Sequence, residues 1–278
     1  MKEIIQNTLK QISTSIPSSN EEYKGDDGLM YCSICHEPKE VLIKNPITNI
    51  IDKFHCICAC QSQKLKEYET EKFKEYLERQ RLICFNETNM KQWNFEHDDQ
   101  HNPELTKIML AYVQQFDDFF TQGRGLLLYG GVGTGKTFFA ACIANSLINL
   151  NRSVYMTTFS RLVNEIQSKS FEEKQLFIDA VNKYSLLVID DLGTERDTDF
   201  MLEQLFNIID SRYRSGRPLI VTTNLSMEDI KNPPDIRYAR IYDRILERCF
   251  PIEVNGITRR RISFANSYHE IKQKLGIK

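Results

Sequence analysis

The feature that most constrains this chain is a glycine-rich octapeptide near its middle. Residues 130–137 read GGVGTGKT and satisfy the pattern G-x-x-x-x-G-K-[ST] in full. Glycine permits backbone angles that turn successive N–H groups inward, so that they form a nest for an anion. The pattern needs an apolar strand before it and a helix after it, and the runs LLLY and FFAACIANSLI occupy those places. The octapeptide therefore predicts a phosphate-binding loop at the edge of an α/β sheet.

Each position of this loop has an expected role toward a nucleoside triphosphate. The Lys136 ammonium would reach the β- and γ-phosphates, and the Thr137 hydroxyl would ligate Mg²⁺. The helix that begins at Lys136 adds the positive end of its dipole to the same site. The residues expected to wrap the phosphates are Gly130, Gly131, Val132, Gly133, Thr134, Gly135, Lys136 and Thr137.

Two acidic residues follow a second buried strand. Leu186–Ile189 is a continuous apolar run, and it ends in Asp190 and Asp191. A carboxylate beside the phosphate loop can complete the magnesium shell, which is the role expected of Asp190, while Asp191 is placed to orient the attacking water. Glu195 is close enough to compete for that water. Taken alone, a strand that ends in two acids is typical of a solvated turn, and only the phosphate loop favours a catalytic interpretation.

A polar amide ends a third apolar strand. Asn224 follows Leu219–Thr223 and is placed to sense the γ-phosphate and its water. The alternative is a turn residue or a helix N-cap before Leu225 and Ser226. The two earlier motifs favour the first interpretation.

An arginine-rich stretch lies farther along the chain. Arg237, Arg240, Arg244 and Arg248 recur at spacings of three or four, so on a helix they form one basic stripe. A guanidinium stabilises charge on a transferring phosphoryl group and can be supplied by a neighbouring subunit. Two alternatives remain open: a surface stripe paired with nearby acids, or contact with a nucleic-acid backbone, which the arginines at 259–261 would also suit.

Apolar runs bounded by turn residues alternate with longer helical patterns from about residue 103 onward. This alternation predicts an α/β fold, a mostly parallel sheet covered by helices on both faces. Pro103 is expected to open a helix that ends near Gly123. The expected strands are Gly125–Tyr129, Ser153–Thr157, Leu186–Asp190, Leu219–Thr223 and Phe250–Val254, and the expected helices cover 136–149, 159–182 and 198–214.

Five of the eight cysteines are clustered near the start of the sequence. Two short clusters separated by a loop are what a tetrahedral structural zinc needs, because each turn supplies two thiolates and the metal replaces a core too small to form alone. The candidate ligands are Cys32, Cys35, Cys56, Cys58 and Cys60, four of which would bind Zn²⁺. His36 and His55 stay open as ligands, and unliganded thiols in a flexible tail are the alternative.

The motifs divide the chain into three expected parts. Residues 1–60 form a zinc-binding module that begins with a short amphipathic helix over 2–13, residues 61–85 form a helical linker, and residues 86–278 form the nucleotide-binding domain. Trp93 and Phe95 would either flank the base or staple the linker to this domain.

No apolar run is long enough to span a membrane and no secretory core is present at the start, so a cytoplasmic protein is expected. The net charge of −2 leaves any nucleic-acid contact to a local basic patch.

With these elements in order, the chain resembles the DnaC/DnaI-type helicase loaders and the related IstB transposition ATPases of the AAA+ group. The resemblance runs over roughly residues 80–265 and is carried by GGVGTGKT, LLVIDDLGTE, IVTTNL and YARIYDRILERC. The cysteine module is similar to that of DnaI-like and phage loaders. Matched position by position, the resemblance implies Walker A at Lys136 and Thr137, Walker B at Asp190 and Asp191, sensor 1 at Asn224, an arginine finger at Arg244 and sensor 2 at Arg259.

The resemblance implies an AAA+ ATPase with ATP, Mg²⁺ and Zn²⁺ as cofactors. Asp191 stands where many AAA+ proteins have Glu. Because the shorter carboxylate lies farther from the attacking water, slow hydrolysis is expected.

The implied function is loading of a hexameric DnaB-type replicative helicase onto single-stranded DNA, with ATP-dependent self-assembly and with residues 1–60 binding the helicase. One alternative is an IstB-like ATPase that regulates DNA transposition on duplex DNA. Another is an ATP-dependent switch or scaffold without DNA contact. Helicase binding, filaments on duplex DNA, or no nucleic-acid binding at low salt would distinguish the three.

Overall fold

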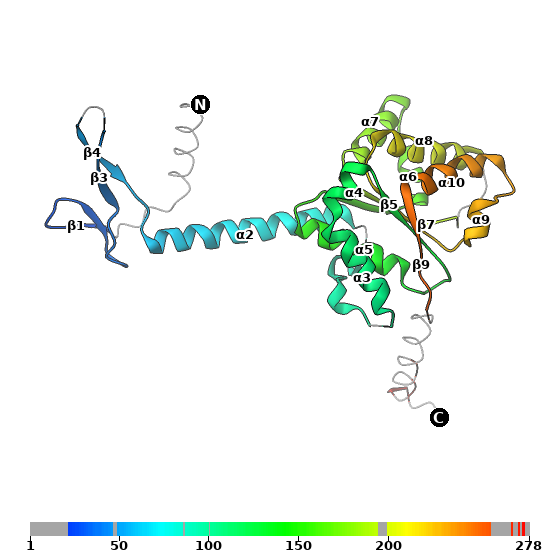
Figure 1. The fold of residues 1–278 in the computed structure, drawn as a ribbon, viewed down its shortest axis with the longest axis horizontal. Coiled ribbons are helices and arrows are strands. Elements are labelled where there is room, and N and C mark those ends of the chain that lie inside the picture. Colours follow the sequence, from blue (N-terminus) through cyan, green and yellow to red (C-terminus); the bar gives the residue numbers. More distant parts are fainter. Residues whose placement is uncertain are drawn as a thin grey trace. The chain divides into compact units, whose positions relative to one another are not determined.

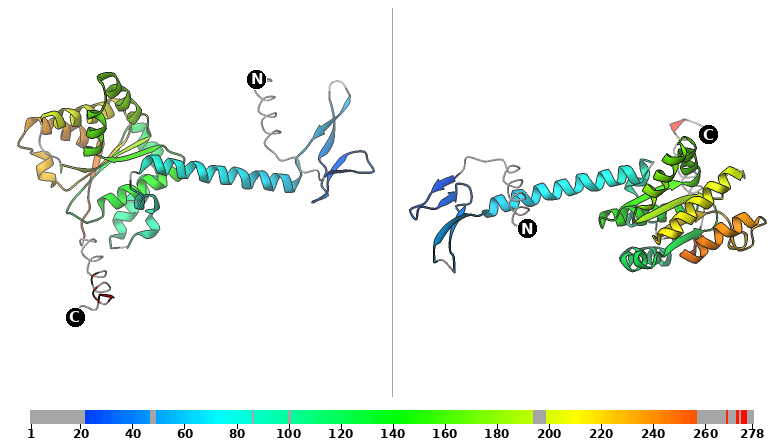
Figure 2. Two further views of the ribbon diagram at one scale, coloured as in Figure 1. Left: turned by 180° about the vertical axis from the view of Figure 1, so that it is seen from behind. Right: turned by 90° about the horizontal axis from the view of Figure 1, so that it is seen from above.

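The computed structural model describes residues 22–46, 49–85, 87–99, 101–193 and 199–256, together with residues 268, 272, 274 and 275. The chain divides into two compact units, Met1–Tyr76 and Leu77–Lys278 (Figures 1 and 2). The helix expected over 2–13 lies outside the described residues. None of the described helices combines the length and the apolar character needed to cross a membrane.

Two small antiparallel ladders make up the first unit. β1 (Glu22–Lys24) pairs with β2 (Met30–Cys32), and β3 (Glu40–Lys44) pairs with β4 (Ile51–His55). Among the described residues of this unit, the buried apolar side chains are those of two cysteines, Cys32 and Cys58. Short two-stranded ladders without an aliphatic core are marginally stable at best in water, so this unit needs another source of stability.

A long helix, α2 (Ala59–Cys84), follows the second ladder and continues into the second unit. Its sequence is rich in Lys, Glu and Gln, and the only buried residue in it is Cys84. Good helix formers without Gly or Pro favour a solvent-exposed helix of this kind. The helical linker expected over 61–85 is therefore present as a helix that begins two residues earlier and ends one residue earlier. Two short 3₁₀ helices, η1 (Asn89–Gln92) and η2 (Phe95–His97), come next.

The second unit is built on a five-stranded sheet in which neighbouring strands run parallel. The strand order β6-β7-β8-β5-β9 places β5, which carries the glycine loop at its end, between β8 and β9. The predicted α/β class is confirmed. The strands Gly125–Tyr129 and Leu219–Thr223 have the predicted bounds, and the other three differ from the prediction by one or two residues. The strands are β5 (Gly125–Tyr129), β6 (Val154–Thr158), β7 (Leu186–Leu192), β8 (Leu219–Thr223) and β9 (Cys249–Glu253).

Helices cover both faces of this sheet, as the alternating pattern predicted. One face packs against α3 (Pro103–Gln114), α4 (Phe116–Gln122) and α5 (Lys136–Asn149). The other packs against α6 (Phe159–Gln167), α7 (Phe171–Asn182), α8 (Asp199–Ser215), α9 (Met227–Lys231) and α10 (Ile236–Arg248).

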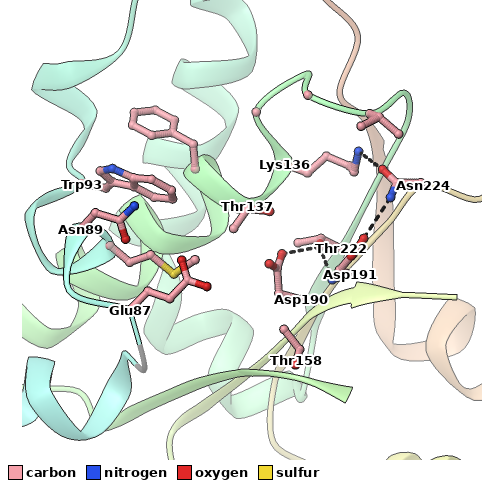
Figure 3. A pocket seen from close by; sticks show the side chains of 15 residues that line it. Glu87, Asn89, Trp93, Lys136, Thr137, Thr158, Asp190, Asp191, Thr222 and Asn224 are labelled. Atoms are coloured by element: carbon pink, nitrogen blue, oxygen red, sulfur yellow. Dashed lines mark hydrogen bonds between the residues drawn. The ribbon is translucent and has the colours of Figure 1, made fainter. Parts of the chain in front are cut away.

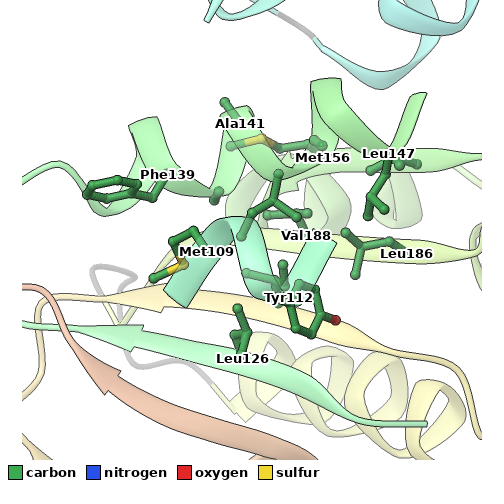
Figure 4. Packing of buried hydrophobic residues seen from close by; sticks show 14 of the residues in the cluster. Met109, Tyr112, Leu126, Phe139, Ala141, Leu147, Met156, Leu186 and Val188 are labelled. Carbon is green, nitrogen blue, oxygen red and sulfur yellow. The ribbon is translucent and has the colours of Figure 1, made fainter. Parts of the chain in front are cut away.

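The two hydrophobic cores follow from the alternation of side chains along each strand. Leu126 and Leu128 belong to the core on the α5 side, whereas Leu127 between them belongs to the core on the α8 side. Figure 4 shows Leu126, Leu186 and Val188 packed in the first of these cores. Because both faces of the sheet are covered, the strands are apolar at almost every position rather than at every second one.

The segment predicted to be helical over 159–182 forms two helices. α6 ends at Gln167 and α7 begins at Phe171. Ser170 caps α7, because its backbone N–H donates to Glu173 Oε2 at 2.8 Å and its side chain completes a capping box with the same glutamate. The expectation of one continuous helical segment was wrong, since a serine followed three residues later by glutamate is a helix start signal.

One guanidinium is buried inside the second unit and joins three segments of its backbone. Arg212, on α8, is 1% exposed. Its Nε and Nη2 donate to the Pro218 carbonyl at 3.1 and 2.6 Å, and its Nη groups also donate to the carbonyls of Asn182, Tyr184 and Ser185 at 3.0 to 3.3 Å. These carbonyls belong to the connections that lead into β7 and β8. The arginine therefore satisfies a set of backbone acceptors where two neighbouring strands begin.

Replacing this arginine should destabilise the second unit. Arg212→Met keeps an unbranched apolar stem but leaves the carbonyls without donors, so we expect a loss of about 2–4 kcal/mol in the free energy of unfolding. Urea unfolding followed by the fluorescence of Trp93, the one tryptophan of the chain, measures it. Arg214→Met is the matched control, because the Arg214 side chain is 76% exposed and its ion pair with Asp210 lies at the surface end of α8. Equal losses in the two variants would contradict this role of Arg212.

Candidate nucleotide-binding site

The glycine-rich loop lies between β5 and the first turn of α5 (Figure 3). Gly130 has a φ of 137° and approaches β9 so closely that a Cβ there would lie 2.7 Å from the Val254 carbonyl oxygen. Gly135 has a φ of 106° and is the N-cap of α5. Both positions thus require glycine, for space in one case and for backbone angle in both. The loop consequently places the N-terminus of α5 at the cavity that Lys136 and Thr137 line.

Lys136 places its ammonium group inside the loop. The side chain is mostly buried, with 7% exposure, and Nζ donates to the carbonyl oxygens of Gly130 at 2.9 Å and Gly131 at 2.7 Å. It also donates to Oδ1 of Asn224 at 2.7 Å. These neutral acceptors satisfy a buried cation that an anionic phosphate would bind more strongly.

Asp190 lies at the end of β7, where its carboxylate is 7% exposed. The Thr222 hydroxyl donates to its Oδ1 at 2.5 Å. Burial raises the pKa of Asp190, while hydrogen bonds from the hydroxyls of Thr222 and Thr137 oppose that rise. A buried carboxylate beside the hydroxyl of the phosphate loop provides the oxygen donors that Mg²⁺ prefers.

Asp191 and Asn224 are joined directly. Nδ2 of Asn224 donates to Oδ1 of Asp191 at 2.9 Å, so one amide bridges this carboxylate and the Lys136 ammonium. Asp191 has a φ of 59°, a left-handed conformation that is uncommon outside glycine. The structure thus brings together three residues that the sequence placed on separate strands and in the loop.

These residues surround one cavity of about 660 Å³, which is within the range of small-molecule sites. Figure 3 shows Lys136 and Asn224 on one side and Trp93 and Asn89 on the other. The lining comprises Glu87, Asn89, Met90, Trp93, Val132, Gly133, Gly135, Lys136, Thr137, Phe138, Thr158, Asp190, Asp191, Thr222 and Asn224. The cavity is therefore bordered by the glycine-rich loop and its acidic and amide neighbours at one end, and by Trp93 with the polar side chains of Glu87 and Asn89 at the other.

Trp93 lines this cavity and also packs on the unit. Its ring lies 5.8 Å from that of Phe138, and both rings contact the α5-side core. Phe95 packs against the same core and is not among the lining residues. Trp93 therefore borders the cavity and the core, whereas Phe95 contacts the core alone, although the sequence analysis gave both residues the same two possible roles.

The segment that carries Trp93 is fixed by a buried amide that the sequence did not single out. Asn145, on α5, is 4% exposed and donates through Nδ2 to the carbonyls of Met90 and Trp93, each at 2.9 Å. Its Oδ1 accepts from Arg81 Nε at 3.3 Å. No sequence signal marks this residue, because its partners lie more than fifty positions away.

Arg244 lies outside the residues that line the cavity. On α10, its Nε donates to Asp210 Oδ1 at 2.7 Å, and its guanidinium lies 4.6 Å from the centre of the Phe206 ring. Arg237, at the start of the same helix, pairs with Asp235. Arg237 thus pairs with a neighbouring acid, as the surface-stripe alternative expected, whereas Arg244 pairs with Asp210 on α8 and its side chain is 27% exposed. Glu195 and Arg259 lie outside the described residues.

Four of the five clustered cysteines come together in the first unit. The Sγ atoms of Cys32, Cys35, Cys58 and Cys60 all lie within 4.8 Å of one another. Cys56 is not part of this group, because its Sγ donates to the Pro38 carbonyl at 3.2 Å. Hydrogen bonds from the backbone amides of Cys35 and Ile34 lower the pKa of Cys32 to about 6, which favours the thiolate that a metal needs. Four cysteine thiolates are the ligand set of many tetrahedral structural zinc sites, so this cluster fits a structural zinc ion.

Comparison with known proteins places the chain in a family and supports the fold. Residues 62–265 match the family described as IstB-like ATP binding protein. The replicative helicase loader DnaI of Bacillus subtilis (strain 168) is 32% identical over 171 residues, which cover 54% of each protein. A putative insertion sequence ATP-binding protein of Sinorhizobium fredii (strain NBRC 101917 / NGR234) is 27% identical over 165 residues, which cover 58% of this chain and 55% of that protein. The chain thus spans about half the length of the curated relatives it matches.

Among solved structures, that of the DnaC helicase loader is similar in fold. Its TM-score is 0.54 at 23% sequence identity, and the match covers 61% of this chain and all of that one, 100%. This likeness is one of fold and agrees with the parallel sheet described above.

Removal of the loop ammonium tests the site directly. In Lys136→Ala the phosphates lose a buried charged donor, so we expect ATP affinity to fall on the order of 100-fold, measured by isothermal titration calorimetry. Lys107→Ala is the control, because Lys107 is 70% exposed and pairs only with neighbouring Glu104 among the ion pairs found. Both variants should stay folded, as checked by circular dichroism. Unchanged ATP affinity in Lys136→Ala would refute the assignment.

Proposed function

We propose that this chain, which belongs to the IstB-like ATP-binding protein family and is an AAA+ ATPase of the DnaC/DnaI type, loads a ring-shaped replicative helicase onto single-stranded DNA. The observation that carries the proposal is the 32% identity to a replicative helicase loader over 171 residues. The relatives are matched over only about half their length, so the partner and the DNA are part of the proposal.

The described side chains suggest how ATP would be used. Lys136 would exchange the loop carbonyls for the β- and γ-phosphates, and Thr137 with Asp190 would hold Mg²⁺, which neutralises phosphate charge when bound. Asp191 would orient the attacking water. Its carboxylate is one methylene shorter than that of glutamate, so hydrolysis would be slow and the ATP-bound state long-lived.

Binding would also change the contacts of Asn224. In the structure its amide bridges Lys136 and Asp191. When the ammonium turns to a phosphate, that amide oxygen loses a charged donor and the bridge is remade around the γ-phosphate. ATP binding and the position of the water-orienting carboxylate are thereby coupled through one side chain.

ATP-dependent self-assembly is a second part of the proposal. Arg244 is the candidate for acting on the nucleotide of a neighbouring subunit. To do so it would leave Asp210, a carboxylate that is 12% exposed. Asp210 also pairs with Arg214 at 2.9 Å, so it would keep a cationic partner after Arg244 has moved. The exchange would therefore leave no buried carboxylate unpaired.

The first unit is proposed to bind the helicase through its β3–β4 ladder. Its side chains there include an unusual share of exposed apolar groups: Val41, Leu42, Ile43, Ile51 and Phe54 are 41% to 60% exposed. Val41 is paired with Phe54, so these two side chains and that of Ile43 share one face of the ladder. Exposed apolar groups that share a face are typical of an interaction surface. Zinc held by the four clustered thiolates would keep this ladder folded, because the unit has no aliphatic core among its described residues.

A function in DNA transposition is the alternative that one observation favours. The matched family carries the IstB name, and an insertion sequence ATP-binding protein is among the relatives. Such a protein would act on duplex DNA rather than on a helicase ring.

A loading assay separates the two functions. The chain is mixed with the hexameric replicative helicase of its own host, ATP and closed circular single-stranded DNA, and helicase retained on the circle is measured after gel filtration. We expect retention to depend on this chain and to be lost in Lys136→Ala. ATP-dependent filaments on duplex DNA without any helicase complex would instead support transposition, and absence of all nucleic-acid binding at low salt would support a switch without DNA contact.

The zinc site predicts different behaviour for two neighbouring cysteines. Cys58→Ser should lose the bound metal, because Cys58 is one of the four converging thiols, whereas Cys56→Ser should keep about one zinc ion per chain. Zinc content after dialysis is measured by inductively coupled plasma mass spectrometry. ATP affinity should stay the same in both variants, since the cavity residues lie in the second unit. Full zinc content in Cys58→Ser would contradict the proposed ligand set.

A further inference from the structure

The hydroxyl of Thr222 contacts both acidic residues at the end of β7. Thr222 lies on β8 and is 1% exposed. Its Oγ1 donates to Asp190 Oδ1 at 2.5 Å, and the same oxygen accepts from the backbone N–H of Asp191 at 2.9 Å. The hydroxyl therefore donates its one proton to the Asp190 carboxylate and accepts the Asp191 N–H through a lone pair.

The backbone explains why this hydroxyl is needed. Between β7 and β8, Ile189 is opposite Val221 and the next pair joins Leu192 to Thr223. Two residues of β7, Asp190 and Asp191, thus stand opposite the single residue Thr222, which is a β-bulge. The N–H of Asp191 bonds to the Thr222 side chain at this irregular point of the ladder.

The bulge changes where the two carboxylates point. In a regular strand successive side chains face opposite sides of the sheet. Here Asp190 and Asp191 are adjacent, yet both line the same cavity. Asp191 reaches this position through its left-handed φ of 59°, a conformation that costs free energy in any residue but glycine. A hydrogen bond to its N–H is one contact that holds the backbone there.

We propose that Thr222 is a positioning residue that aligns the metal-binding carboxylate of Asp190 and the water-orienting carboxylate of Asp191 through one hydroxyl. The inference rests on the proposed ATPase mechanism and deepens it. Thr222 lines the cavity, but its hydroxyl proton is donated to Asp190 and its oxygen accepts from Asp191, so it acts through the two acids. The residue supports metal-dependent hydrolysis more than it supports binding of the nucleotide itself.

The adjacent threonine provides a matched comparison. Thr223 is also 1% exposed on β8, but its Oγ1 donates to the Leu192 carbonyl at 2.7 Å and accepts from the Leu225 N–H at 3.1 Å. Its partners are backbone groups and not acidic side chains. Thr223 is therefore a control for Thr222: it is a buried threonine on the same strand whose hydroxyl bonds only to backbone groups.

Three variants test the proposal: Thr222→Val, Thr222→Ser and Thr223→Val. Valine keeps the shape and the buried methyl group of threonine, whereas serine keeps only the hydroxyl. ATP affinity is measured in EDTA, Mn²⁺ affinity is measured by electron paramagnetic resonance on protein saturated with a slowly hydrolysed ATP analogue, and kcat is measured at saturating Mg²⁺. Unfolding midpoints are taken from the fluorescence of Trp93.

In Thr222→Val we expect metal-free ATP affinity within about twofold of the unsubstituted chain, with Mn²⁺ affinity and kcat each lowered by about tenfold or more. Thr222→Ser should restore both to within about threefold. Thr223→Val should lower the unfolding midpoint and leave Mn²⁺ affinity unchanged, because neither acid loses a partner.

Two results would overturn the role of Thr222. One is Thr222→Val with unchanged Mn²⁺ affinity and kcat, and the other is Thr222→Ser impaired as strongly as Thr222→Val, which would assign the effect to packing of the methyl group. Absence of ATP binding by the unsubstituted chain would overturn the nucleotide site as well. The two failures are therefore distinguishable.

Discussion

Burial of the Lys136 ammonium at the carboxyl edge of a parallel sheet is the interaction on which the rest of the site depends. A buried cation needs acceptors around it, and two loop carbonyls and the Asn224 amide provide them. Because neighbouring parallel strands end at the same edge, the residues after β5, β7 and β8 meet there. The amide of Asn224 then links the ammonium to Asp191. A phosphate that enters the loop must compete with this whole set of contacts, so nucleotide binding rearranges more than the loop itself.

The acidic pair shows how a local irregularity serves such a site. A regular strand would direct Asp190 and Asp191 to opposite faces of the sheet, and only one carboxylate would reach the cavity. The bulge opposite Thr222 brings both to the same side, at the cost of a left-handed residue. Burial raises the pKa of Asp190, and hydrogen bonds from the hydroxyls of two threonines limit that rise.

The two units are stabilised by different physics. The second has aliphatic cores on both faces of its sheet, and a buried guanidinium at Arg212 satisfies the carbonyls where its strands begin. The first has, among its described residues, only the side chains of Cys32 and Cys58 as buried apolar groups. Four converging thiols can replace an aliphatic core only with a metal between them. Its exposed apolar side chains are thereby left available to a partner instead of being used for folding.

The sequence by itself determined the elements whose signal is local. The spacing of GGVGTGKT predicted the loop, apolar runs predicted the strands, and their alternation with helical patterns predicted the parallel sheet. What it left open depends on contacts between distant segments. It could not choose four ligands from five cysteines, since Cys56 is separated from the others only by the fold. It did not find Asn145 or Thr222 either, because a buried asparagine and a strand threonine look ordinary until their partners are known. Tertiary structure decided these points because side-chain direction and strand register are set by packing, not by neighbours in the chain.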